Sequence, residues 1–238
     1  EELENGAPIE IKMKQLKLDS PQWNRNILND IDIEIKPGEK IGLTGEMGAG
    51  KSSFLQVIAG LYDRFDGGLF YNGVPYQKVK LESLRSCVGD NLRQEEIFEA
   101  SLLENISLGR DSVKREQVEE LIDLTGLRAF VEDLPDGLYT KLPSSGMGLS
   151  SSIRNRILMA RGMSGKHSIL LIEDNWYHMD VEIRERWLKH LCLECDQTVV
   201  MASNNRDALK KFNRIIILKD GRIQKTGSYD ELEEDLPC

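Results

Sequence analysis

The sequence predicts an α/β fold, in which strands and helices form a core and a mostly helical lobe is inserted into it. Three near-continuous apolar runs, at residues 168–172, 198–202 and 214–218, are typical of parallel strands that are covered on both faces. At residues 9–13 and 31–35, apolar and polar residues alternate instead, which indicates strands with one buried face. The chain therefore combines fully buried and half-buried strands.

The first third of the chain alternates strands and turns before one helix. A short apolar strand at residues 40–44 runs directly into a glycine-rich loop. From Lys51 to Gly60 the apolar spacing becomes helical, and Gly60 is a residue that commonly ends a helix. A further pair of strands is expected around Phe70 and the turn at residues 72–73, Asn-Gly.

Residues 83–165 change to helical spacing and are interpreted as the inserted helical lobe. Residues 1–82 and 166–238 are interpreted as the core with its β region, so that the whole chain forms one domain. Its 238 residues, of which 40% are hydrophobic, suffice for one sizeable core with a smaller lobe. Two sets of residues carry the helical spacing: Val118, Leu121, Ile122 and Thr125, and then Ile153, Ile157 and Arg161.

Composition argues against two classes of protein. The net charge of −9 disfavours a nucleic-acid-binding protein, whose binding surface is basic. No apolar run approaches the roughly 20 residues that span a bilayer, and the acidic start at residues 1–4 is unlike a secretory signal. If the domain serves a membrane process, we expect the membrane-spanning part to lie on another chain or outside this stretch.

Two cysteines have a spacing that occurs in redox and metal sites. Cys192 and Cys195 form a C-x-x-C pair within a predicted helix over residues 181–195. No second pair exists, and His190 nearby brings the set to only three possible ligands, which does not make a closed zinc site. A packing role for the two small sulfur side chains is favoured.

The glycine-rich loop has the residues of a phosphate-binding loop. The run from Gly45 to Ser52 fits the pattern G-x-x-x-x-G-K-[ST] at every fixed position. Glycines allow successive backbone N–H groups to turn inward around an anion, and the following helix presents its positive end to the same charge. We expect Lys51 to reach the outer phosphates of ATP and the Ser52 hydroxyl to bind Mg²⁺. The predicted nucleotide-binding residues of this loop are Gly45, Glu46, Met47, Gly48, Ala49, Gly50, Lys51, Ser52 and Ser53.

The order of motifs resembles the nucleotide-binding domain of ATP-binding cassette (ABC) transporters, specifically of the exporter type. Strings typical of that family occur at residues 26–31, 36–40, 81–85, 103–106 and 214–222, so the resemblance covers nearly the whole chain. It implies an ABC ATPase fold, namely a P-loop NTPase with a RecA-like core, an antiparallel β lobe and an inserted α-helical lobe. It also implies that two such domains sandwich two ATP molecules, each between one phosphate loop and the partner's signature helix.

Several positions depart from the family pattern. The aromatic residue that the family places under adenine aligns with Ser20, and Trp23 either takes that role or is a loop residue without it. The family's coupling glutamine aligns with Arg93. Gln94, one place later, either reaches Mg²⁺ or the attacking water, or is a solvated loop residue.

The family's signature, Leu-Ser-Gly-Gly-Gln, aligns with residues 149–153, Leu-Ser-Ser-Ser-Ile. In the family this segment presents a serine hydroxyl, a glycine backbone and a helix N-terminus to the partner's γ-phosphate. Ser150 keeps the hydroxyl, although a plain helix N-cap explains it equally well. Ile153 cannot form a side-chain hydrogen bond. The signature is therefore degraded.

The acidic motif and the switch residue also differ. The strand at residues 169–172 ends in Glu173 and Asp174, the reverse of the family's Asp-Glu order. By this resemblance, Glu173 holds Mg²⁺ through water and Asp174 is the catalytic base, one methylene shorter than the family's residue. Asn204 aligns with the switch histidine and can donate a hydrogen bond but carries no charge. Asp180 keeps the position of the family's inter-subunit aspartate, where it also fits a helix N-cap.

Four hypotheses follow, and the losses favour one of them. The chain is an active transport ATPase, a degenerate cassette that binds ATP with slow or no hydrolysis, another class of P-loop enzyme, or a docking domain without nucleotide. Hydrolysis requires oriented water and stabilised charge together, whereas binding requires mainly the loop, Lys51 and Mg²⁺. We therefore expect intact binding and impaired turnover. The expected partners are an exporter's transmembrane domain and a second cassette, identical or different, at the cytoplasmic face of a membrane.

Overall fold

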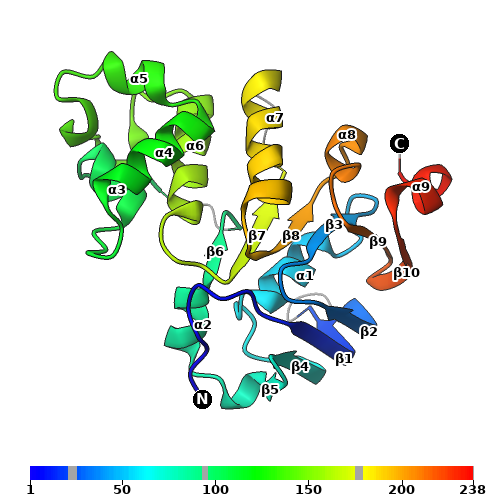
Figure 1. Cartoon of the computed structure of the whole chain (residues 1–238). Helices are drawn as coiled ribbons and strands as arrows, with labels where there is room; N and C mark the ends of the chain where they lie inside the picture. Colours follow the sequence, from blue (N-terminus) through cyan, green and yellow to red (C-terminus); the bar gives the residue numbers. More distant parts are fainter. Residues whose placement is uncertain (21–25, 93–95, 175–178, 238) are drawn as a thin grey trace.

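The computed structural model describes residues 1–20, 26–92, 96–174 and 179–237. Its centre is a six-stranded sheet in the order β10-β9-β3-β8-β7-β6 (Figure 1). Neighbouring strands from β9 to β6 run parallel, and β10 pairs antiparallel with β9. The strands are β3 (Lys40–Thr44), β6 (Val88–Asp90), β7 (Ile169–Glu173), β8 (Thr198–Ala202), β9 (Arg214–Lys219) and β10 (Arg222–Gly227).

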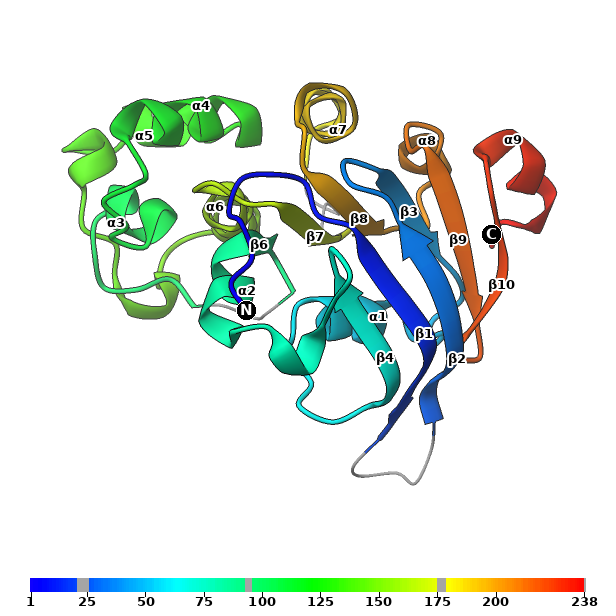
Figure 2. The ribbon, with the colours of Figure 1, turned by 60° about the horizontal axis from the view of Figure 1, so that its bottom comes forward.

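A second, antiparallel sheet lies beneath the first, in the order β2-β1-β4-β5 (Figure 2). Strands β1 and β2 extend beyond the alternating stretches at residues 9–13 and 31–35. Their pairing shifts register after Met13, so the alternation in the sequence ends there although the two strands continue. Gln15 and Asp30 adopt positive φ at this irregularity, which moves the buried positions on to Leu16 and Leu18 and breaks the alternation. The strands are β1 (Ile11–Asp19), β2 (Asn26–Ile35), β4 (Asp66–Tyr71) and β5 (Val74–Pro75).

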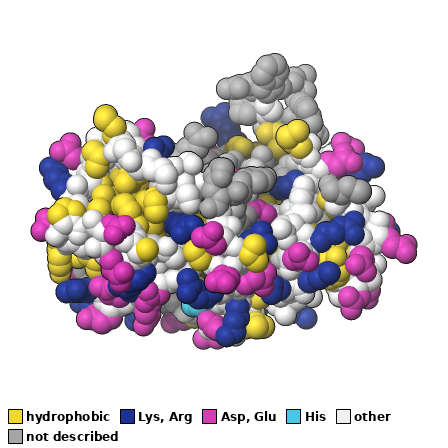
Figure 3. Space-filling view, turned by 90° about the horizontal axis from the view of Figure 1, so that it is seen from above, with side chains coloured by type: hydrophobic (Ala, Val, Ile, Leu, Met, Phe, Trp, Pro, Cys, Tyr) yellow, Lys and Arg dark blue, Asp and Glu magenta, His cyan; other side chains and the backbone are white. Residues whose placement is uncertain are grey.

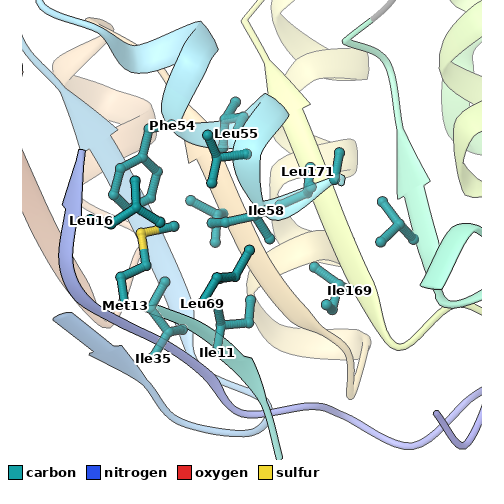
Figure 4. Packing of buried hydrophobic residues seen from close by; sticks show 14 of the residues in the cluster. Ile11, Met13, Leu16, Ile35, Phe54, Leu55, Ile58, Leu69, Ile169 and Leu171 are labelled. Atoms are coloured by element: carbon teal, nitrogen blue, oxygen red, sulfur yellow. The ribbon is translucent and has the colours of Figure 1, made fainter. Parts of the chain in front are cut away.

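Helices and the antiparallel sheet cover the two faces of the central sheet. Helix α1 (Lys51–Ile58) packs between the sheets, where its Phe54 and Ile58 side chains lie among apolar residues of both (Figure 4). Helices α7 (Val181–Lys189) and α8 (Arg206–Leu209) cover the opposite face. Helix α9 (Tyr229–Leu232) packs against β9 and β10. The sheet is thus covered on both sides, as its apolar strands predict.

The helical lobe stands beside the sheet and has an apolar core of its own. Four of its predicted spacing residues, Val118, Leu121, Ile122 and Ile157, are buried there. The lobe comprises α3 (Leu102–Ser107), α4 (Arg115–Thr125), α5 (Arg128–Glu132) and α6 (Ser151–Met163). The lobe also contains two short 3-10 helices, η2 (Gly137–Tyr139) and η3 (Ser144–Gly146). Two more lie outside it: η1 (Tyr76–Lys78) follows β5, and η5 (Glu233–Asp235) follows α9.

The beginning of the predicted helical stretch joins the core instead of the lobe. Helix α2 (Leu81–Cys87) leads into β6, which pairs with β7 at the edge of the central sheet. The backbones of β6 and α6 approach so closely that a Cβ on Gly89 would lie 2.4 Å from the Gly162 carbonyl oxygen. A Cβ on Gly162 would lie equally close, 2.4 Å, to the Asp90 carbonyl oxygen. These two glycines make the junction between lobe and core.

The C-x-x-C pair lies in a helix that changes its winding. Helix α7 ends at Lys189 and continues as a π-helix, η4 (His190–Glu194), so the predicted helix stops one residue before Cys195. Burial raises the pKa of the Cys192 thiol to about 11 and also raises the pKa of Cys195. Thiols that stay protonated are poor nucleophiles and poor metal ligands, which favours the packing role.

The described surface shows no concentration of one charge on the face seen from above. Acidic and basic side chains are interspersed there, and hydrophobic side chains gather mainly over the helical lobe (Figure 3). Among the described residues, we find no helix with the length and apolar character that crossing a bilayer requires. Within the same residues, no group of three or more His, Cys, Asp or Glu side chains is placed to hold a metal ion.

We predict that Phe54→Ala destabilises the protein strongly. The Phe54 side chain is fully buried between the two sheets, so its removal leaves a cavity and should lower the free energy of unfolding by about 3–5 kcal/mol. Urea denaturation followed by circular dichroism measures this change. Met47→Ala is the matched control, because that side chain is 99% exposed. An equal effect of the two substitutions would contradict the packing described here.

Candidate functional site

The glycine-rich loop lies at the carboxyl end of β3 and leads into α1. Gly45, Gly48 and Gly50 all have positive φ angles, of 148°, 83° and 102°. A Cβ on Gly45 would lie 2.2 Å from the Leu218 carbonyl oxygen, so no other residue fits without movement of β9. Around Gly48, by contrast, no heavy atom lies within 4 Å of such a Cβ. The loop is therefore wedged against the sheet at its start and open at its middle.

The turn between β9 and β10 supports the other side of the loop. The Gly221 N–H donates to the Ala49 carbonyl oxygen at 3.1 Å, and the Gly221 carbonyl oxygen accepts from the Asn29 N–H at 2.8 Å. A Cβ on Gly221 would lie 2.3 Å from the Ile27 carbonyl oxygen. The turn at residues 219–222 thus fixes the phosphate loop against β2, a contact that the sequence alone does not reveal.

Lys51 begins α1 and folds back over the loop. Its ammonium donates to the carbonyl oxygens of Gly45, at 2.5 Å, and of Glu46, at 3.0 Å. Burial lowers the pKa of this ammonium, and the nearby Glu173 carboxylate opposes that shift. The cation is thus held at the loop, where an anionic ligand would meet the first amide groups of α1.

Glu173, the last residue of β7, is fixed through its backbone. Its N–H donates to Asn91 Oδ1 at 2.8 Å, and the Asn91 side-chain amide donates to the Glu173 carbonyl oxygen at 2.9 Å. The carboxylate atom Oε1 is buried and has no hydrogen-bond partner among the residues that the structure describes. A buried carboxylate oxygen without a donor is a position that a cation or its bound water would satisfy.

Asp174 is bound to the neighbouring strand. Its backbone N–H donates to the Ala202 carbonyl oxygen at 3.0 Å, and its Oδ2 accepts from the Ser203 hydroxyl at 2.6 Å. Ser203 is itself fixed, because its N–H donates to the Leu43 carbonyl oxygen at 3.0 Å. One oxygen of the carboxylate predicted to act as base therefore already accepts a hydrogen bond from a protein hydroxyl.

Asn204 follows β8 and faces the start of the phosphate loop. Its Oδ1 accepts from the Thr44 hydroxyl at 2.9 Å. Because the oxygen is engaged there, the Nδ2 end is the one left to donate to a ligand. Asn204 thus has the hydrogen-bonding capacity expected of it, and Thr44 orients it.

These residues share one cavity of about 1470 Å³. The loop from Met47 to Ser53 lines it, together with Glu173, Asp174 and Asn204. Gly45 and Glu46 are not among the residues that line the cavity, but their carbonyl oxygens accept hydrogen bonds from Lys51. Additional lining residues that sequence reasoning did not single out for the site include Asn26, Ile27, Arg184, Asn205, Asp220 and Gly221.

Two predicted residues, Trp23 and Gln94, lie outside the described residues, as does Arg93. Ser20, at the position aligned with the family's adenine aromatic, lines the cavity. Which side chain stacks on a base and which one corresponds to the coupling glutamine therefore stay predictions from the sequence.

The segment aligned with the signature has the geometry of an ordinary helix start. Ser150 is the N-cap of α6, and its hydroxyl accepts from the Ile153 N–H at 3.2 Å. Asp180 stands at the N-cap of α7, but its side chain makes no capping bond. Its carboxylate instead accepts from the Arg156 guanidinium at 3.3 Å, which joins α6 to the start of α7.

Comparison with known proteins places these features in a family. Residues 28–176 match the ABC transporter family. The lipid A-core flippase of Chromobacterium violaceum is 29% identical over 216 residues, which cover 90% of this chain and 37% of the flippase. The alpha-hemolysin translocation protein HlyB of Escherichia coli O157:H7 is 29% identical over 224 residues, 94% of this chain and 32% of that protein. The chain thus spans about a third of the length of these curated relatives.

A solved structure shows the same fold. A bacterial Atm1-family ABC exporter with ATP bound superposes with a TM-score of 0.87 at 24% identity, covering 98% of this chain and 41% of that chain. The predicted α/β ABC ATPase fold is confirmed.

We predict that Gly45→Ala and Gly48→Ala differ in effect although both glycines have positive φ. Each substitution places a Cβ in a left-handed conformation and should cost about 1–2 kcal/mol of stability. Gly45→Ala adds the clash with the Leu218 carbonyl oxygen and should lower stability further and abolish nucleotide binding. Urea unfolding and calorimetric titration with ATP measure the two effects. Equal stability of the two variants would show that the loop does not press on β9.

Proposed function

This chain belongs to the ABC transporter family as an exporter-type ATP-binding domain, and we propose that it binds ATP with Mg²⁺ while hydrolysing it slowly. One contrast carries the proposal. The phosphate loop and Lys51 have the geometry of a binding site, whereas Asp174 and Asn204, the groups proposed for hydrolysis, are each bonded to a protein hydroxyl.

Binding rests on the loop from Gly45 to Ser53. Positive φ at its glycines turns backbone N–H groups toward the open middle of the loop, and α1 adds the positive end of its dipole. The Lys51 ammonium can exchange its two carbonyl acceptors for phosphate oxygens, which are stronger partners because they are charged. Trp23 or another residue near Ser20 would complete the adenine side.

The residues present fit a magnesium ion. Ser52 offers a hydroxyl at the start of α1, and Glu173 offers a buried carboxylate oxygen without a described partner. Oxygen donors of this kind suit Mg²⁺, with Gln94 proposed as a further ligand. When bound, the ion supplies charge neutralisation to the phosphates. Lys51 and the loop amides then share the remaining negative charge.

Two features of the site should slow hydrolysis: the short side chain of Asp174 and the lack of positive charge on Asn204. Asp174 is one methylene shorter than a glutamate, and the Ser203 hydroxyl holds its Oδ2 toward β8. A misplacement of about 1 Å costs roughly 10²-fold in rate. Asn204 can donate a hydrogen bond to a phosphate but adds no positive charge to the transition state. We therefore propose that Asp174 acts as the base and Asn204 as the switch residue, each less effectively than the residue that the family has at that position.

We propose that the domain works at the cytoplasmic face of a membrane, attached to a transmembrane domain and paired with a second cassette. The relatives' names include a flippase and a translocation protein, and each is about three times as long as the matched stretch. Because Ser150 is engaged in its own helix cap, this chain should serve the partner's nucleotide poorly. An intact partner cassette would then provide the better of the two shared sites.

We predict that Lys51→Ala abolishes ATP binding without unfolding the protein. The ammonium is the main cation of the loop, so calorimetry with ATP and Mg²⁺ should show heat for the unaltered domain and none for the variant. Lys141→Ala, an exposed lysine paired with Glu99, is the matched control and should bind normally. Absence of heat from the unaltered domain would overturn the proposed function.

We also predict that Asp174→Glu increases ATP hydrolysis. The added methylene extends the base toward the water position, and a well-placed general base contributes about 10²–10⁴-fold. Phosphate release from the full transporter, with and without the substitution, measures the gain. Asp174→Asn keeps the shape but cannot accept a proton, so it should not exceed the unaltered rate. Rapid hydrolysis by the unaltered protein that Asp174→Asn leaves intact would contradict the assignment of Asp174.

A further inference from the structure

Two basic side chains line the nucleotide cavity within the described residues, Lys51 from the loop and Arg184 from α7. Three acidic residues line the same cavity, namely Glu173, Asp174 and Asp220. A triphosphate adds further negative charge to this lining. Besides Lys51 and the Mg²⁺ ion proposed above, Arg184 is therefore a further cation that a bound triphosphate can meet.

The topology places Arg184 at the phosphate end of the cavity. Helix α7 covers the face of the sheet that β7 and β8 form, and the Arg184 N–H donates to the Asp180 carbonyl oxygen at 3.0 Å in its first turn. Glu173 ends β7 and Asn204 follows β8, whereas Ile27 lies on β2, beyond β3 and β9. Arg184 is therefore on the side of the acidic pair and the switch position, opposite the adenine side.

Other charged residues of α7 point elsewhere. Glu185 forms an ion pair with Lys211 at 2.7 Å. Arg186 lines a different cavity, between α4 and α7, near Asp123. The hydrogen bond from Arg128 is the main cause that lowers the pKa of Asp123, and the charge of Arg186 adds to it. For the half-buried Arg184 guanidinium, the described part of the chain offers no hydrogen bond and no ion pair. Its charge is thus available to a ligand in the cavity.

We propose that Arg184 is a phosphate-binding residue that contacts the terminal phosphate of a bound nucleoside triphosphate. This assignment rests on the proposed function, since it needs a nucleotide held by the loop and Lys51. A guanidinium forms paired, charge-assisted hydrogen bonds with phosphate oxygens. It supplies the positive charge that Asn204 lacks, from a helix instead of from the end of β8.

This role makes Arg184 a determinant of triphosphate over diphosphate binding. The backbone amides of the loop contact phosphates that both ATP and ADP possess, whereas Arg184, at the far end, meets only the third phosphate. Loss of Arg184 should therefore weaken ATP binding selectively. A residue with a purely structural task on α7 would change the affinities for both nucleotides alike, or lower the stability of the domain.

The test compares Arg184→Gln, Arg184→Lys and the matched control Arg186→Gln, which removes the same charge from the other side of the same helix. Calorimetry with Mg²⁺ gives the affinities for ADP and for an ATP analogue whose γ-phosphate is not hydrolysed. We expect Arg184→Gln to weaken binding of the analogue by about tenfold, the size of one charge-assisted contact, and to leave ADP binding nearly unchanged. Arg184→Lys should restore part of the loss, and Arg186→Gln should have no effect.

Two results separate this assignment from the proposed function. If Arg184→Gln leaves the ratio of the two affinities unchanged while Lys51→Ala still abolishes binding, Arg184 does not contact the terminal phosphate and the proposed function stands. If the unaltered domain binds neither nucleotide, both fall together. Thermal unfolding of each variant shows whether α7 stays intact, and a selective loss of analogue affinity at unchanged melting temperature supports the assignment.

Discussion

The arrangement of the site depends on how tightly the phosphate loop is wedged into the sheet. Gly45 has no space for a side chain because the Leu218 carbonyl oxygen occupies it, and the Gly221 turn holds Ala49 by a backbone hydrogen bond. The same turn is hydrogen-bonded to Asn29 on β2. Three elements far apart in the sequence therefore meet at one small loop, and the loop's conformation is set by backbone atoms rather than by the side chains that a ligand contacts.

Three residues at positions aligned with family motifs already have a hydrogen-bond partner within the protein. Asp174 accepts from Ser203, Asn204 accepts from Thr44, and Ser150 caps its own helix. Polar groups that already have partners gain less from a ligand than orphaned groups do, because an existing hydrogen bond must first be broken. Glu173 differs, since its buried Oε1 has no hydrogen-bond partner among the described residues. Lys51 has two carbonyl partners, but charged phosphate oxygens are stronger acceptors and can replace them. This difference is the physical basis of the proposal that the cavity binds ATP but hydrolyses it slowly.

Much of the fold was predictable because its patterns are local. Continuous apolar runs predict β7, β8 and β9, and the glycine pattern with its flanking strand and helix predicts the loop. The three residues of β6 carry no pattern, since they join the sheet only through pairing with β7. The place of Arg184 in the cavity could not be predicted for a similar reason. An arginine in an amphipathic helix is ordinary in sequence, and only the placement of α7 over β7 and β8 brings it to the nucleotide cavity.

The lobe and the core are joined unequally at their two ends. Near β6, the backbones at Gly89 and Gly162 are in contact with no side chain between them, which leaves little room for relative movement at this junction. At the other end, Arg156 reaches a mostly exposed Asp180 carboxylate, a pair that water and salt weaken easily. A turning force on the lobe would thus pivot it about the two glycines and part the ion pair first. Ile183 and Trp187 of α7 also pack against the lobe, at Gly126 and Met163, so the orientation of the lobe and that of the helix carrying Arg184 would change in one movement.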